Sequence, residues 1–138
     1  MYSTLDDIKK LLPAEIIIQL TDDENTGAIN QARVDEAISQ ADAEIDSYCA
    51  GKYTVPFTTV PAVVKKISVD IAIYNLYSRK VEEIPDTRKD RYNNAIRQLK
   101  RIADGTITLG IDPAPAPSSE GEIKTSDRTF TKDKLGGY

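Results

Sequence analysis

Residues 22–30 are the stretch whose residue types and spacing come closest to a known binding chemistry. Oxygen-bearing side chains stand at positions 1, 3 and 5 of this stretch, Gly27 at position 6 and Asn30 at position 9. Calcium loops place carboxylate and amide ligands at this spacing. Position 12, which in such loops is a glutamate that binds the ion with both oxygens, is Arg33 here. Our interpretation is therefore a turn that caps the following helix, and calcium binding is the alternative.

The acidic residues of the next segment could form paired carboxylates for acid–base chemistry. Asp42 and Asp46 are four residues apart, with Asp35 and Glu44 nearby, and this spacing puts the first two on one helical face. Because that face lies opposite the apolar stripe of the same helix, we interpret it as a solvated face. Cys49, beside the stripe, is interpreted as a small packed hydrophobe.

Asp70 interrupts a helix that is otherwise almost uniformly apolar. A buried carboxylate needs a partner or hydrogen-bond donors to offset its desolvation. We therefore predict that Asp70 is a structural buried polar residue, held by a salt bridge or a cap inside a helical bundle.

The sequence contains no histidine. Histidine is the usual general base near neutral pH and the commonest metal ligand. Its absence excludes Ser–His and Cys–His nucleophile pairs and nearly all transition-metal sites. We expect no enzymatic activity, no metal and no cofactor.

The elements that position these residues are predicted to be helices. Thr4 and Asp7 form a helix-start signal, and Pro13 separates a first short helix from a second one at 14–20. A long helix from about residue 31 is indicated by a single apolar stripe at spacings of 4, 3, 4 and 3. Gly51 is suited to a left-handed cap at its end. The residues of the stripe are Val34, Ile38, Ala41, Ile45 and Tyr48.

Two further long helices follow an extended segment at residues 53–60. Residues 62–79 are apolar nearly all round, which is typical of a helix packed on several sides. Pro85 opens the last helix, Gly105 ends it, and residues 106–109 alternate like a short strand. The predicted fold class is all-α: a compact bundle of two short N-terminal helices and three long helices, with a short extended element and a C-terminal extended arm.

Composition divides the chain into three parts: a helical body at 1–111, a Pro/Ala-rich linker at 112–119 and a C-terminal arm, expected to dock on a partner, at 120–138. The single cysteine excludes an internal disulfide and fits a reducing compartment. No basic region precedes an apolar stretch at the N-terminus, and no apolar run reaches the length of a membrane span. We expect a protein of the cytoplasm with no membrane segment.

Charge is distributed unevenly along the body. Residues 1–51 hold 11 acidic and 3 basic residues, whereas residues 52–111 hold 6 acidic and 11 basic residues. The simpler interpretation is that the two halves neutralise each other within one fold. The alternative is that an acidic face of one subunit meets a basic face of the next, which closes into a ring when the rotation allows. The basic residues of the last helix also suit a nucleic-acid surface, although an overall pI near 4.9 argues against an autonomous binder.

Several motifs, individually weak, occur in a specific order and spacing along nearly the whole chain. In these motifs the chain resembles a family of small phage and prophage proteins. The family is typified by a protein of bacteriophage Mu from its head morphogenesis region. Members often have a more acidic loop at 22–30, from which Glu24 and Thr26 depart, and this departure weakens a metal site further. The motifs are Ala41-Asp42-Ala43-Glu44-Ile45-Asp46-Ser47-Tyr48, Tyr53-x-x-Pro56, Val60-Pro61, Asp70-Ile71-Ala72-x-Tyr74-x-Leu76-Tyr77, Arg91-Tyr92, Leu99-x-x-Ile102-Ala103-x-Gly105 and Arg128-x-Phe130-Thr131-Lys132-Asp133-x-Leu135.

The resemblance implies a virion or assembly protein, made in the cytoplasm of the bacterial host and located at the head–tail junction. The expected architecture of the chain is similar to that of head–tail connector adaptors, which form rings of about twelve subunits below the portal. The implied partners are other copies of the chain, the portal protein and a neck, stopper or tail-completion protein, close to packaged DNA and away from any membrane. The alternatives are a head-completion or scaffolding factor and a calcium-binding accessory protein. The arm residues expected to dock on a partner are Arg128, Phe130, Leu135 and Tyr138.

Overall fold

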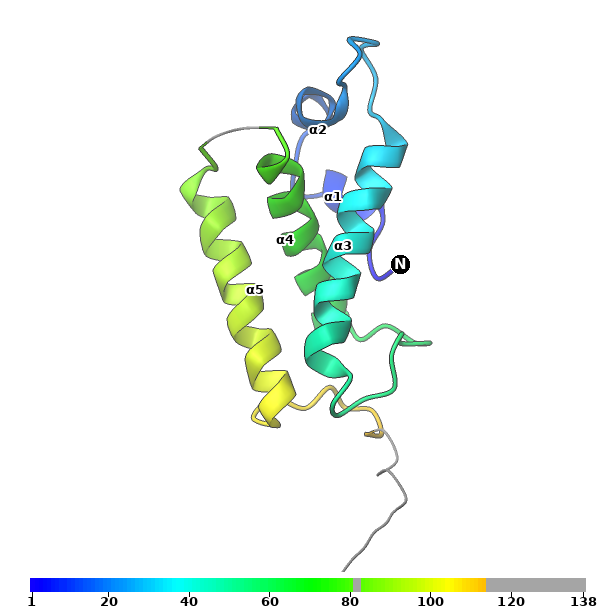
Figure 1. The fold of residues 1–138 in the computed structure, drawn as a ribbon, viewed down its shortest axis with the longest axis vertical. Coiled ribbons are helices and arrows are strands. Elements are labelled where there is room, and N and C mark those ends of the chain that lie inside the picture. The colour runs from blue at the N-terminus through cyan, green and yellow to red at the C-terminus, as the bar shows by residue number, and fades with distance from the viewer. Residues whose placement is uncertain (81–82, 114–138) are drawn as a thin grey trace, which may run out of the picture.

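Three long helices run side by side along the molecule, and two short helices lie against them (Figure 1). A computed structural model describes residues 1–80 and 83–113 of the chain. Within these residues there are five α-helices and no strand, so the all-α prediction is confirmed. From residue 114 onward the predicted linker and the whole docking arm lie outside the described residues. The helices are α1 (Leu5–Lys9), α2 (Ala14–Thr21), α3 (Gln31–Cys49), α4 (Ala62–Ser78) and α5 (Asp86–Asp104).

The predicted helix starts are confirmed at the N-terminal end. The Thr4 hydroxyl accepts a hydrogen bond from the Asp7 backbone N–H, and the Asp7 carboxylate accepts one from the Thr4 N–H. This reciprocal capping box satisfies two donors that the first turn of α1 would otherwise leave unpaired. Pro13 precedes α2, where its fixed φ suits the position and its missing N–H costs nothing.

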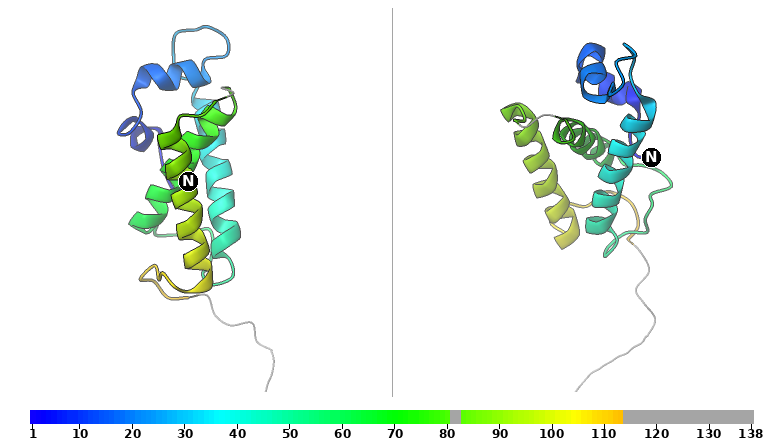
Figure 2. Two further views of the ribbon diagram at one scale, coloured as in Figure 1. Left: turned by 90° about the vertical axis from the view of Figure 1, so that its left-hand side faces the viewer. Right: turned by 45° about the horizontal axis from the view of Figure 1, so that its top comes forward.

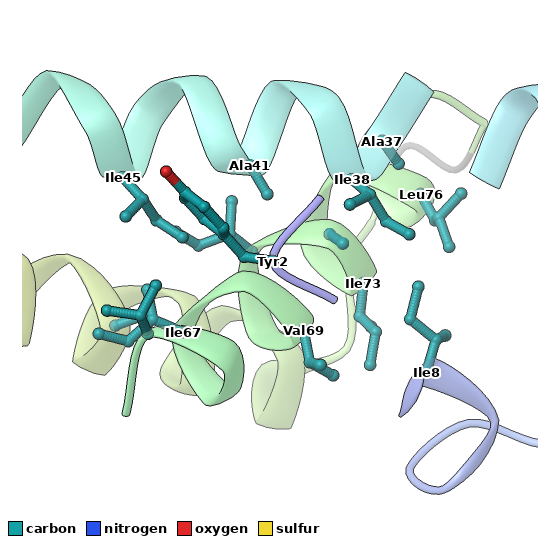
Figure 3. Close-up of a cluster of buried hydrophobic side chains, with 14 of the residues drawn as sticks. Tyr2, Ile8, Ala37, Ile38, Ala41, Ile45, Ile67, Val69, Ile73 and Leu76 are labelled. Atoms are coloured by element: carbon teal, nitrogen blue, oxygen red, sulfur yellow. The ribbon is translucent and has the colours of Figure 1, made fainter. Parts of the chain in front are cut away.

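α4 is the central helix of the bundle. It packs against α3 on one side and α5 on the other, and α2 lies across the end at which α3 begins (Figures 1 and 2). Nine residues of α4 are buried, around the whole of its circumference, as its apolar sequence predicts. Figure 3 shows side chains of α1, α3 and α4 meeting in the core, with Tyr2 lying between α3 and α4.

Two local predictions were wrong. Gly51 does not take up a left-handed conformation, because the chain stays right-handed after α3 while the N–H groups of Lys52 and Tyr53 donate to the Cys49 carbonyl. Residues 106–109 form no strand, because the Ile107 N–H donates to the Arg101 carbonyl and the Leu109 N–H to the Tyr53 hydroxyl. In a strand, these backbone N–H groups would donate to a neighbouring strand. Here they donate to the end of α5 and to a tyrosine hydroxyl instead.

The end of α5 agrees with its sequence. Gly105 has a φ of 87°, which a glycine adopts without the steric cost that a side chain would add. Among the described residues, no helix is both long enough and apolar enough to cross a bilayer.

Candidate interaction surfaces

A polar network fixes the N-terminal residues to α3 and α4. The Tyr2 N–H and the Ser68 hydroxyl donate to the two carboxylate oxygens of Asp42, at 3.0 and 2.9 Å. The Tyr2 hydroxyl donates to Asp46 and accepts a hydrogen bond of 3.1 Å from the Phe57 N–H. Asp42 and Asp46 are therefore engaged inside the fold, and the prediction that they form a solvated face was wrong.

The physical reason for this difference is that the residues before α1 cover that face. Tyr2 and Ser3 are 5% and 1% exposed, so the acidic face of α3 has a protein partner instead of water. Burial raises the pKa of Asp42, although the Tyr2 N–H and the Ser68 hydroxyl act against this shift. Burial and the hydrogen bond to Asp46 raise the pKa of Tyr2 as well. An isolated tyrosine ahead of a helix carries no periodicity, so the sequence pattern gave no signal for this contact.

The loop at 22–30 is a turn held by its first aspartate. One carboxylate oxygen of Asp22 accepts from the N–H and the hydroxyl of Thr26, and the other accepts from the Gly27 N–H at 2.7 Å. Hydrogen bonds from the Thr26 and Gly27 N–H groups lower the pKa of Asp22. Asn30 then caps α3 by accepting from the Arg33 N–H. These bonds confirm the interpretation as a helix-capping turn.

The second aspartate of the loop is an anchor for cations. The Arg79 guanidinium lies 2.8 Å from one Asp23 oxygen, Lys80 lies 3.2 Å from the other, and Arg33 lies 3.5 Å away. The hydrogen bond from Arg79, with that from Lys80, lowers the pKa of Asp23 well below its usual range. Arg79 also donates to the Leu20 carbonyl, so it ties α2 and the loop to the end of α4. Among the described residues, no three acidic or sulfur side chains converge as metal ligands do.

Asp70 is buried in the interface between α4 and α5. The residue is 3% exposed; Lys66 lies 2.8 Å from one carboxylate oxygen and Arg91 lies 3.9 Å from the other. The oxygen facing Arg91 forms no hydrogen bond within the described chain. Asp70 therefore lies within ion-pair distance of two cations, but only one of its carboxylate oxygens forms a hydrogen bond. Cys49 is fully buried, and burial, together with the nearby Asp46 charge, raises its pKa to about 11.

A cationic groove lies beside Asp70. We use this term for a hollow of about 270 Å³ between α4 and α5, lined by Lys66, Arg97 and Arg101 together with the amides of Asn94 and Gln98. Lys66 pairs with the buried Asp70, and Arg97 donates to the Asn94 side chain. Within the described part of the chain, neither Arg97 nor Arg101 has a carboxylate at ion-pair distance. Three neighbouring cations with one buried carboxylate leave the groove able to bind an anionic group.

A second hollow, the lysine-rimmed groove, lies between α1 and the first half of α4. It has a volume of about 280 Å³ and an apolar floor of Leu11, Ala62 and Val69. Leu11 is 40% exposed, which is unusual for a large apolar residue of this fold. The groove is also lined by Lys10, Lys65 and Lys66, and by Asp7.

Neither groove was predicted from the sequence, because each joins residues of two helices whose relative placement no local pattern gives. The clustering of basic residues along the last helix was the signal for the first groove. The predicted docking residues Arg128, Phe130, Leu135 and Tyr138 lie outside the described residues.

The chain matches known phage and prophage proteins over most of its length. The family described as "Bacteriophage Mu, Gp36" matches residues 2–126. The chain is 30% identical over 128 residues to the Mu-like prophage FluMu protein gp36 of Haemophilus influenzae, with 91% of this chain and 89% of that protein covered. It is 29% identical over 115 residues to gene product J of Escherichia phage Mu, with 80% of this chain and 79% of the phage protein covered. The resemblance read from the sequence motifs is confirmed, and the chain belongs to the bacteriophage Mu Gp36 family.

Proposed function

We propose that this protein is a non-enzymatic structural subunit of a phage particle, a head–tail connector that forms a ring between the portal and the neck or tail. Its place would be the head–tail junction of the virion. Membership of a family of Mu-like phages supports a role in the phage, and the helical body with two interaction grooves supports a role in assembly.

The observation that carries the proposal is a cationic groove at one end of the bundle, together with exposed carboxylates at the other end. Arg97 and Arg101 line the cationic groove in the second half of α5, at the end where α3 finishes (Figure 1). At the other end, Glu15 on α2 and Glu24 in the following loop are exposed. A contact between unlike surfaces of two copies repeats from subunit to subunit, and it closes into a ring at the right rotation.

Fewer acidic residues are available for a contact between subunits than the sequence alone suggests. Of the acidic residues before residue 52, Asp7, Asp22, Asp23, Asp42 and Asp46 are engaged within the fold. Two of these, Asp7 and Asp23, pair with cations of the fold, and the other three are held by hydrogen bonds from uncharged groups. The remaining exposed carboxylates are the ones available to a neighbouring subunit.

The arm at 120–138 completes the proposal. Phe130, Leu135 and Tyr138 would anchor it on the portal or an adjacent ring, with Arg128 adding a charged contact. Repeated arms on a ring of about twelve subunits would give avidity to a weak individual contact.

The ring contact is tested by native mass spectrometry of the Arg97→Glu/Arg101→Glu variant across a range of salt concentrations. We expect the wild-type oligomer to weaken as salt rises and the variant to remain monomeric. The matched control is Lys100→Glu, which changes an exposed charge of α5 outside the groove and should leave the oligomer intact. An oligomer unaffected by both salt and the double substitution would contradict the charge contact. Binding of duplex DNA lost in the same variant would instead favour a DNA-contacting role.

A further inference from the structure

The lysine-rimmed groove combines an apolar floor with positive charge. Its rim carries three ammonium groups, and the side chains of Lys10, Lys65 and Lys66 are 75%, 53% and 59% exposed. These lysines pair with two carboxylates, Asp7 and Asp70, which are 11% and 2% exposed, so three cations of the rim face two acids. A segment that fits this groove needs an apolar side chain for the floor and carboxylates for the rim.

The described chain ends close to this groove. Ile111 and Asp112 line a hollow together with Phe57, Thr58 and Thr59. Three residues after Thr59 comes Ala62, which lies on the floor of the lysine-rimmed groove, and three residues span at most about 11 Å. The chain therefore leaves the body within a short distance of the groove.

The sequence beyond this point contains a segment with the required chemistry. Residues 120–123 read Glu-Gly-Glu-Ile, with two carboxylates and one branched apolar side chain in four residues. Only six residues, 114–119, separate Pro113 from Glu120, and this tether extends to at most about 25 Å. Such a short tether gives a high effective concentration at a nearby site.

The rest of the arm fits the groove less well. Phe130 and Leu135 are apolar, but the two lysines between them outnumber the single carboxylate, Asp133, and would face the ammonium groups of the rim. The charge of the groove therefore favours binding of the first residues of the arm over binding of its last residues.

We propose that Glu120–Ile123 bind the lysine-rimmed groove of their own chain, with Ile123 on the Leu11–Ala62–Val69 floor and the two glutamates at the lysine rim. This contact covers the exposed Leu11. It also divides the arm into a section held on the body and a terminal section, from about residue 124, that remains available to a partner. The inference concerns the isolated subunit and does not depend on the ring.

A single tryptophan tests the proposal in the full chain, which contains none of its own. In the Ile123→Trp variant we expect blue-shifted emission that does not change with protein concentration, because the indole is buried against its own body. Leu135→Trp is the matched control and should emit as an exposed indole.

Charge reversal and rescue make the test specific to this groove. Adding Lys10→Glu/Lys65→Glu to the Ile123→Trp variant should shift the emission to that of an exposed indole. A further Glu120→Lys/Glu122→Lys change should restore the blue shift, and circular dichroism should show unchanged helix content throughout.

Three outcomes would overturn the proposal. Red, solvent-exposed emission from Trp at residue 123 would show that the segment is not held in an apolar site. A blue shift that persists through the charge reversal would place the segment elsewhere. A blue shift that appears only as protein concentration rises would mean that the groove takes the segment of a second copy.

Discussion

The Tyr2 hydroxyl donates a hydrogen bond to the Asp46 carboxylate, 44 residues further along the chain. The same hydroxyl accepts from the Phe57 N–H, so one oxygen joins the N-terminal segment, α3 and the connection that leads into α4. The Tyr2 ring packs at 5.6 Å from that of Phe57. This attachment fixes the N-terminal segment against α3 and the connection into α4.

We predict that Tyr2→Phe lowers the free energy of unfolding by about 1–3 kcal/mol, because the buried Phe57 N–H and the half-buried Asp46 carboxylate lose a partner. Urea unfolding followed by circular dichroism measures this loss. The control is Tyr77→Phe, which removes a hydroxyl from a half-buried tyrosine with no hydrogen bond from that hydroxyl in the described chain. Equal stabilities of the two variants would contradict a role for the Tyr2 hydroxyl.

The ion cluster at Asp23 predicts a particular dependence of stability on pH. Hydrogen bonds from Arg79 and Lys80 lower the pKa of Asp23 in the folded state below the unfolded value of about 3.9. The stabilisation that Asp23 contributes is therefore fully present at pH values above the unfolded-state pKa. It is lost as the pH falls towards the folded-state pKa.

Asp23→Asn should accordingly be less stable than wild type at neutral pH and should lose less stability on acidification. Denaturant unfolding across the acid range measures both effects. Glu24→Gln, at the adjacent exposed carboxylate, is the control and should follow the wild-type profile. Parallel profiles for wild type and Asp23→Asn would contradict the linkage.

Cys49 is predicted to be unreactive in the folded protein. Its thiol is fully buried and its pKa is raised to about 11, so almost no thiolate forms at neutral pH. Alkylation by iodoacetamide should be slow in buffer and should rise to the rate of a free thiol in denaturant. Rapid alkylation under native conditions would show that the end of α3 opens to solvent.

Asp70 is predicted to cost stability, because one of its buried oxygens has no hydrogen bond and its partners Lys66 and Arg91 are 59% and 40% exposed. Replacing a buried ion with an apolar residue of similar size is often neutral or stabilising by about 1–4 kcal/mol. We expect this for Asp70→Leu, because both cations can be solvated once the carboxylate is gone. Thermal and urea unfolding measure the change, and a loss of about 3 kcal/mol or more would show that the ion pair holds the α4–α5 interface together.

The sequence predicted the helices well because their signals are local. Thr4 with Asp7, Pro13, the apolar stripe of α3 and Gly105 each act within a few residues of the element that they define. The near-uniform apolarity of residues 62–79 also predicted that α4 would be central, since only burial on all sides tolerates such a surface.

The contacts between distant segments could not be predicted in this way. Asp42 and Asp46 lie opposite the stripe, and only the position of Tyr2 in three dimensions turns them from solvated residues into half-buried acceptors. Gly51 has the right residue type for a helix cap, but the hydrogen bonds of Lys52 and Tyr53 to Cys49 keep the chain right-handed. The two grooves likewise depend on how α1, α4 and α5 pack.

Electron microscopy with native mass spectrometry on the protein mixed with the portal of its phage tests the central claim most directly. The full chain should form a closed ring stacked on the portal. A variant lacking residues 112–138 should form the ring but lose or weaken its attachment to the portal. Absence of any ring and of any association with the portal, at every salt concentration, would contradict the connector proposal and favour a head-completion or scaffolding role.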